Sequence, residues 1–96
     1  MKYDIVYLSD AQNDIQNAKK WYKSKQIGLE KRFAIEVKNA ILLIGNDPHL
    51  FEVRYRNTRI VFTKIFPFGI HYTIDKTQNR VVILAVLHTS KDSNNW

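Results

Sequence analysis

The chain has 96 residues, of which 45% are hydrophobic and 12% aromatic, and its formal net charge is +6. This length suits one small domain, and the apolar fraction is too high for a disordered chain, so we expect a single packed domain over residues 1–96. The absence of cysteine excludes disulfides and thiolate metal sites. The excess of basic over acidic residues favours acidic partners, such as nucleic acid or an acidic protein, although many small basic domains bind no nucleic acid.

Several classes of protein are disfavoured by the absence of their motifs. The N-terminal MKYDIVYLSD has no cleavable apolar segment, and no stretch approaches the ~18 apolar residues of a membrane span, so a cytoplasmic protein is expected. The sequence contains no GxGxxG, GxxxxGK[ST] or GxSxG motif. The histidines His49, His71 and His88 have no metal-ligand spacing, so we expect neither a metal site nor a cofactor.

The first predicted elements are a strand over residues 2–8 and a helix after it. Ser9, with Gln12 three residues later, predicts a capping box at the start of this helix. Trp21 and Tyr22 fall on or beside the apolar stripe of the helix, which favours the core for both over stacking on nucleic-acid bases. Gly28 ends the segment. The stripe is Ala11, Ile15, Ala18 and Tyr22, and Lys19, Lys20, Lys23 and Lys25 crowd the C-terminal end, where cations suit the helix dipole.

A second helix is predicted over about Leu29 to Ile44, and it completes a helical hairpin. Its apolar stripe is wide enough to predict burial on more than one side. Gly45 and Pro48 then form a helix stop. The stripe is Leu29, Phe33, Val37, Ala40, Ile41 and Ile44, widened by Ile35, Leu42 and Leu43.

After Pro48 the apolar period changes from helical to two. It predicts strands over Arg54 to Phe66, Gly69 to Asp75 and Arg80 to His88, the last of them buried on both faces. His71 is expected on the solvated face of its strand. The order is β-α-α-β-β-β, which predicts an α+β fold with an N-terminal strand and a helical hairpin packed on a largely antiparallel sheet.

The strongest local feature is FEVRYRNTRIVFTK, in which four basic residues follow Glu52 without an intervening acid. At the period of a strand, Arg54 and Arg56 should project from the same side, which predicts a basic strip on the sheet. Guanidinium groups match phosphate and carboxylate groups bidentately, so the strip is a candidate binding site. The alternative is an edge strand that its charges keep soluble. The basic residues are Arg54, Arg56, Arg59 and Lys64.

His88 ends the last predicted strand, where VVILAVL gives way to polar residues. A side chain at this point lies at the rim of the sheet, and histidine can transfer protons near neutral pH. His88 is therefore a candidate acid or base, with Arg54, Arg59 or Lys64 as possible phosphate-holding neighbours. A structural or contact role is the more common one for a histidine in this position.

The serial order of the chain, its WY pair before the glycine turn, its NDP, its FPF turn and its VLH ending resemble the RelE/ParE toxins of type II toxin–antitoxin modules. The ParE branch is the more similar one. The stretches that carry the resemblance cover nearly the whole chain: YDIVYLSDAQNDI, AKKWYKSKQIGLEKRF, GNDPHLFEVRYRNTRIVFTKIFPFGIHYTID and RVVILAVLHTSKDSNNW.

The resemblance implies a β-α-α-β-β-β toxin that a cognate antitoxin neutralises, in a toxin–antitoxin hetero-oligomer, by wrapping it with an extended, acidic C-terminal segment. Those ParE-like members that are understood poison DNA gyrase by trapping its cleaved-DNA complex. RelE-like members are metal-independent ribonucleases that cut mRNA on the ribosome with basic side chains on the sheet and a basic or aromatic group near the C-terminus.

The resemblance favours binding over cleavage, because two arginines of the RelE-like site fall at about Gly69 and Ser90 and its C-terminal tyrosine falls at about Trp96. We therefore expect a gyrase-binding toxin without catalytic residues. One alternative is a ribosome-dependent ribonuclease that uses Arg59, Lys64 and His88, and another is a degenerate toxin that only binds its antitoxin. The residues expected to contact gyrase or the antitoxin are Arg54, Arg56, Arg59, His88, Lys91 and Trp96.

Overall fold

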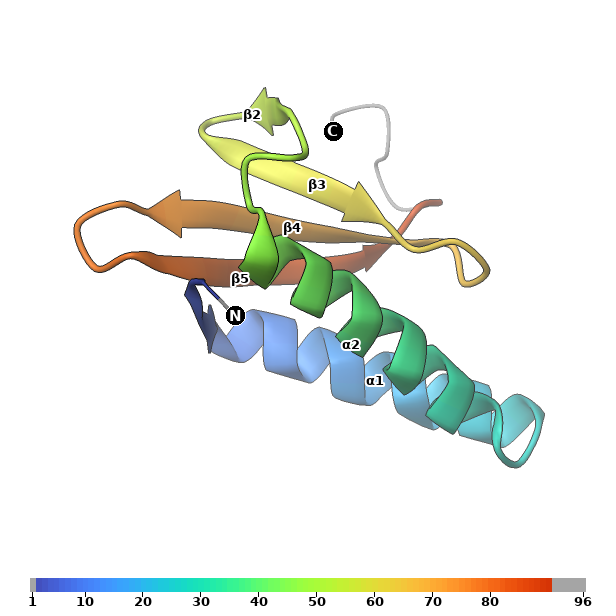
Figure 1. Ribbon diagram of the computed structural model, residues 1–96. Coiled ribbons are helices and arrows are strands. Elements are labelled where there is room, and N and C mark those ends of the chain that lie inside the picture. Colours follow the sequence, from blue (N-terminus) through green and yellow to red (C-terminus); the bar gives the residue numbers. More distant parts are fainter. Residues whose placement is uncertain (1, 91–96) are drawn as a thin grey trace.

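The computed structural model describes residues 2–90 and consists of a helical hairpin packed on one face of a five-stranded sheet (Figure 1). The strand order is β1-β5-β4-β3-β2, with β1 parallel to β5 and the other pairs antiparallel. The predicted α+β fold with a largely antiparallel sheet is confirmed. The elements are β1 (Asp4–Tyr7), α1 (Ser9–Lys25), α2 (Leu29–Asn46), β2 (Val53–Tyr55), β3 (Thr58–Phe62), β4 (Phe68–Asp75) and β5 (Arg80–His88).

The strand predicted over Arg54 to Phe66 is in fact a hairpin of β2 and β3. Arg56 and Asn57 form its turn with φ values of 42° and 59°. Two consecutive residues with positive φ give the turn a twist that matches its flanking strands, and asparagine tolerates this conformation well. The turn contains no glycine, which is the residue that normally marks such a hairpin in a sequence.

The helix termini depart from the predicted capping. Ser9 is the first residue of α1, and Leu8 occupies the N-cap position without a side-chain hydrogen bond, so the predicted capping box is wrong. Gly28 precedes α2 with a φ of 95°, which a glycine adopts without steric cost. The predicted break between the helices is therefore confirmed. No helix in the described residues is long and apolar enough to cross a membrane.

The core lies between the helices and the sheet, and an aromatic cluster fills one end of it. Phe33 of α2 is fully buried, and its ring centroid lies 5.3 Å from Tyr22, 5.6 Å from Phe66 and 5.0 Å from Phe68. Aromatic pairs at these separations stabilise a core beyond the area that they bury. The other fully or almost fully buried apolar residues include Ala11, Ile44, Ile70, Tyr72, Val81, Ile83 and Val86.

Tyr72 fixes the C-terminal end of α2 against β4. Its ring is fully buried, and its hydroxyl donates a hydrogen bond of 2.7 Å to the Pro48 carbonyl. Burial raises the pKa of this phenol to about 12. On β5, Val81 and Ile83 point into the core whereas Val82 is only half-buried, so the predicted burial of this strand on both faces is only partly correct.

Candidate functional site

Arg54 and Arg56, which were expected side by side, are separated by the end of β2. Arg54 lies over the Phe62 ring, with 5.7 Å between its guanidinium carbon and the ring centroid. Arg56 stands in the turn, because β2 ends at Tyr55. The prediction that both side chains project from one strand face is therefore wrong. Both are nevertheless exposed on the β2–β3 hairpin.

Arg59 belongs to the other face of the sheet. It pairs with Tyr72 of β4, whose ring lies in the core beneath the helices. Its Nη1 donates a hydrogen bond of 2.5 Å to the Phe51 carbonyl. This bond anchors the segment between α2 and β2, so Arg59 has a structural role in addition to any contact with a partner.

His88 lies at the rim of the sheet, as predicted, but its ring is engaged locally. It ends β5 opposite Phe68, with 5.2 Å between the ring centroids. The Ser90 backbone amide donates a hydrogen bond of 3.1 Å to Nδ1, and the Ser90 hydroxyl lies 2.7 Å from the same atom. Because an amide can only donate, the neutral ring carries its proton on Nε2. Lys91 and Trp96 lie outside the described residues.

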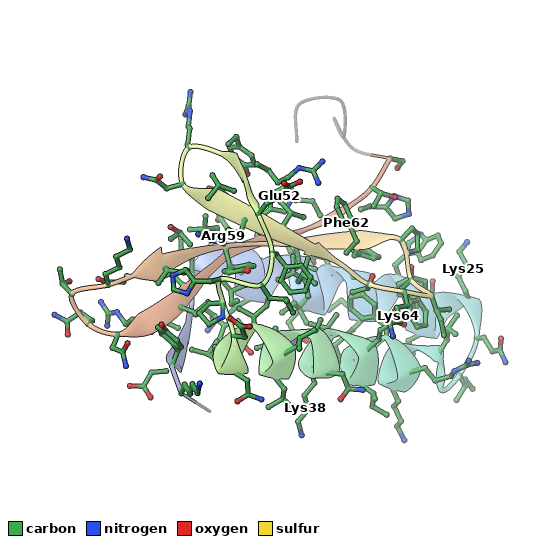
Figure 2. The ribbon with its side chains drawn as sticks, turned by 45° about the horizontal axis from the view of Figure 1, so that its top comes forward. Lys25, Lys38, Glu52, Arg59, Phe62 and Lys64 are labelled. Carbon is green, nitrogen blue, oxygen red and sulfur yellow. The ribbon has the colours of Figure 1, made fainter. Side chains whose placement is uncertain are left out.

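The three residues of the ribonuclease alternative do not form one cluster. Arg59 pairs with Tyr72, four residues along β4 from the Phe68 that pairs with His88. Four residues correspond to roughly 13 Å along a strand. In addition, β3 and β5 lie two strand spacings apart, each of about 4.8 Å. Lys64 follows β3 at the end away from Arg59 (Figure 2). In-line phosphodiester cleavage requires its acid, base and cation within hydrogen-bond reach of one phosphate.

His71 is buried, in contrast to its predicted solvation, because the β2–β3 hairpin covers the helix-free face of β4 at this point. Its exposed fraction is 1%, and Nδ1 lies 2.8 Å from the Tyr55 hydroxyl. Burial lowers the pKa of the imidazole from its usual 6.5, because desolvation penalises the charged form. The strand alternation placed His71 on the correct face, but the covering hairpin depends on contacts distant in sequence.

The buried His71 should make the fold sensitive to mild acid. Below pH 6.5 the unfolded chain binds more protons at this site than the folded chain, so stability present above pH 6.5 is lost as the pH falls. We expect the slope of the unfolding free energy to approach about 1.4 kcal/mol per pH unit at most. Urea unfolding between pH 8 and pH 5 measures it, and His71→Gln should flatten the curve. Tyr55→Phe should lower stability but keep the pH slope, since burial and not the hydrogen bond lowers the pKa of His71. An unchanged pH slope in His71→Gln would show that His71 does not cause the acid sensitivity.

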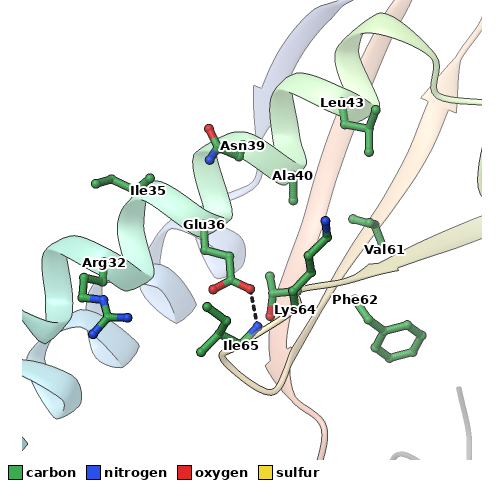
Figure 3. A pocket seen from close by; sticks show the side chains of 11 residues that line it. Arg32, Ile35, Glu36, Asn39, Ala40, Leu43, Val61, Phe62, Lys64 and Ile65 are labelled. Atoms are coloured by element: carbon green, nitrogen blue, oxygen red, sulfur yellow. Dashed lines mark hydrogen bonds between the residues drawn. The ribbon is translucent and has the colours of Figure 1, made fainter.

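An apolar groove runs between α2 and the chain segment from β3 to β4 (Figure 3). Its volume is about 510 Å³. The Ile65 backbone amide donates a hydrogen bond of 2.6 Å to the Glu36 carboxylate, which joins the loop after β3 to the helix. Lys64 reaches toward α2 at the rim. The exposed apolar residues that line the groove are Ile35, Leu43, Phe62 and Ile65, with exposed fractions of 59%, 45%, 43% and 72%.

The groove ends at an open edge of the sheet. The pairing of β2 with β3 reaches only Thr58 and Arg59, and within residues 2–90 no strand pairs with the outer edge of β3 from Ile60 to Phe62. Unpaired strand edges accept an added strand through backbone hydrogen bonds. The groove and this edge together form a surface that fits an extended segment with apolar side chains.

The sequence contains a signal for this groove, although the apolar pattern predicts burial for the residues concerned. Ile35, Leu42 and Leu43 widen the stripe of α2 beyond the part that the sheet covers, and all three are at least 40% exposed. The predicted burial of α2 on more than one side is therefore wrong. Leu43 faces the groove, whereas Leu42 lines a separate depression of about 780 Å³ beside α1 and β1. Among the described residues, no group of His, Asp and Glu is placed to hold a metal ion.

Comparison with known proteins identifies the family. The sequence profile described as the ParE toxin of the type II toxin–antitoxin system parDE matches residues 5–93. No curated protein gives a match. The structure is similar to a chain of the chromosomal ParDE system from P. aeruginosa, with a TM-score of 0.74, 14% identity, and coverage of 91% of this chain and 96% of that one.

Two further solved structures share the fold. A chain of the toxin–antitoxin complex RelBE2 from Mycobacterium tuberculosis aligns with a TM-score of 0.64 and 20% identity over 92% of this chain and 99% of its own. E. coli toxin RelE, as a mutant in complex with an antitoxin RelB peptide, aligns with a TM-score of 0.59 and 13% identity over 98% of this chain and 93% of its own. The profile match spans most of the sequence and the fold agrees with it. The chain belongs to the ParE toxin family of type II toxin–antitoxin systems.

Proposed function

We propose that this toxin arrests growth by binding DNA gyrase and that a cognate antitoxin neutralises it. The family match over residues 5–93 supports the ParE branch. The separation of Arg59 from His88 supports binding over cleavage most directly, because the two residues lie four positions and two strands apart and the Arg59 guanidinium donates to the Phe51 carbonyl.

The antitoxin segment occupies the groove between α2 and β3 in this proposal. The groove offers apolar side chains to one face of the segment and the open edge of β3 to its backbone. Arg32 and Lys64 stand at its rim, and its one acid, Glu36, accepts the Ile65 amide. This charge distribution, on a chain with a net charge of +6, favours an acidic segment.

The gyrase contact involves the β2–β3 hairpin and the rim of the sheet. Arg54 and Arg56 are exposed there, and Glu52 is the only acid of the hairpin segment 51–62. Exposed guanidinium groups pair well with carboxylate and phosphate groups, both of which a gyrase–DNA complex presents. His88, Lys91 and Trp96 are the further contact residues of the proposal.

Purified toxin should inhibit supercoiling by gyrase and cause cleaved DNA to accumulate. The double variant Arg54→Ala/Arg56→Ala should require about tenfold more protein for the same inhibition, since two exposed charge contacts contribute roughly 0.5–1 kcal/mol each. The double variant Lys23→Ala/Lys31→Ala is the matched control, because it removes the same charge from exposed helix positions. An equal loss of inhibition in both variants would show that net charge, and not the hairpin, determines binding, and wild-type inhibition by the arginine variant would exclude the hairpin contact.

The two alternatives give different outcomes in the same system. Cleaved mRNA ends at ribosomal A sites, lost in His88→Ala, together with unaffected gyrase would replace gyrase binding by ribosome-dependent cleavage. Absence of growth arrest on expression without the antitoxin would leave a protein that only binds its antitoxin. Either outcome would contradict gyrase inhibition as the function of this toxin.

A further inference from the structure

Trp21 is exposed near the C-terminal end of α1, although its place beside the apolar stripe predicted a core position. Its exposed fraction is 57%, against 7% for the adjacent Tyr22. The two rings meet edge to face, with 5.1 Å between their centroids and 84° between their planes. Tyr22 itself packs into the aromatic cluster, 4.8 Å from Phe66. Trp21 is therefore an exposed indole that a rigid core supports from one side.

A pocket of about 380 Å³ opens beside this indole, between α1 and the end of β5. This size is within the range of sites for small organic groups, roughly 300–1,000 Å³. The rings of Trp21, Tyr22, Phe68 and His88 contribute to its wall. Asn17 adds an amide with both donors and an acceptor, and Nε2 of a neutral His88 is a donor. Aromatic faces next to a few polar groups are suited to a planar heterocycle.

The pocket and the adjacent surface of α1 carry opposite charges. Inside it, the Asp14 carboxylate accepts the Val86 amide at 3.0 Å, and its negative charge disfavours a phosphate there. Outside it, the last eight residues of α1, AKKWYKSK, contain four lysines and no acid. The Lys25 ammonium lies over the Trp21 ring, 5.0 Å from its centroid. A planar base fits the pocket side, and phosphate groups fit the lysine side.

From this arrangement we propose that the toxin binds single-stranded nucleic acid here, with a base stacked at Trp21 and the adjacent phosphates held by lysines of α1. An exposed aromatic ring beside cations is the arrangement by which proteins bind single strands without reading sequence. A base in a duplex is already stacked on its neighbours, so the site selects single strands. The site lies apart from the α2–β3 groove, and the inference does not depend on gyrase as the target.

The helix geometry separates the lysines that serve this site from those that do not. Lys25 follows Trp21 by four residues and shares its face, whereas Lys23 points roughly 160° away from it at 3.6 residues per turn. Both are exposed and both lie in the last turn of α1. Lys23→Ala is therefore a control for Lys25→Ala (Figure 2) with the same change of charge.

Fluorescence anisotropy of labelled oligonucleotides with the full-length toxin tests the proposal. The probes are a 12-residue oligothymidylate, an oligouridylate, a duplex and an abasic strand of equal length. We expect Trp21→Ala to weaken binding of the single strands roughly 5- to 150-fold, the range of one base–aromatic stack. Trp21→Phe should recover part of this loss. Lys25→Ala should reduce the slope of log affinity against log salt by about 0.7, and Lys23→Ala should not.

A second readout reports on the indole itself. In a Trp96→Phe background Trp21 is the only tryptophan, and the oligothymidylate should quench its fluorescence while the abasic strand should not. Comparison of the oligothymidylate with the oligouridylate identifies DNA or RNA as the preferred source. Wild-type affinity in a folded Trp21→Ala, equal binding of the abasic strand, or preference for the duplex would each overturn the proposal. Gyrase inhibition measured in parallel is a separate outcome, because Trp21 does not belong to the hairpin surface.

Discussion

We expect Phe33→Ala to lower the free energy of unfolding by about 3–5 kcal/mol, the usual cost of truncating a buried aromatic ring. Phe33 is fully buried and contacts the rings of Tyr22, Phe66 and Phe68, which come from α1, from the loop before β4 and from the start of β4. A cavity at this point removes contacts between both helices and the sheet. The surrounding rings are held by one another, so the site should collapse only partly and the loss should lie toward the upper end of the range.

Urea denaturation followed by circular dichroism measures this loss. A domain of this size has roughly 5–15 kcal/mol of stability, so Phe33→Leu, with an expected loss of about 1–2 kcal/mol, keeps the test measurable if the alanine variant does not fold. Ile35→Ala is the control on the same helix, because Ile35 is 59% exposed and its removal should change stability by less than about 0.5 kcal/mol. Similar losses at both positions would show that the aromatic cluster is not the centre of the core.

Local sequence patterns were sufficient to predict the order of the elements. The apolar period of α2 correctly placed Phe33 in the core, and Gly28 correctly marked the break between the two helices. These features depend on residues within one or two helical turns, where spacing and backbone preference decide the conformation. The hairpin turn at Arg56 and Asn57 was missed for the same reason, since it lacks the glycine by which such turns are recognised.

The candidate site depends on contacts between distant segments, and the sequence predicted less of it. Trp21 and Ile35 have the hydrophobicity of core residues, but the sheet does not cover them, and they are exposed. His71 has the polarity of a surface residue, but Tyr55 of the hairpin covers it. In each case a segment far along the chain decides exposure. Ile35 and Trp21 are functional candidates because they line a groove and a pocket, and burial lowers the pKa of His71.

We expect Leu43→Glu to abolish neutralisation by the antitoxin while the toxin itself remains active. Leu43 is 45% exposed and lines the α2–β3 groove, where burial of a leucine by a partner contributes about 1.5–3 kcal/mol. The new carboxylate would also repel an acidic segment. Together these changes should weaken binding about 100-fold. Calorimetric titration with the cognate antitoxin measures the affinity, and growth during co-expression shows whether neutralisation persists.

Leu42→Glu is the matched control, since Leu42 is the adjacent residue of α2, is 40% exposed and lines the depression on the other side of the helix. Both substitutions introduce the same charge into the same helix turn, and glutamate is a good helix former, so the fold should tolerate both. They differ only in the surface that they alter. If the antitoxin uses the groove, Leu42→Glu remains neutralised and Leu43→Glu does not. Loss in Leu42→Glu alone would move the antitoxin to the depression beside α1, and equal loss in both would place it across both sides of α2.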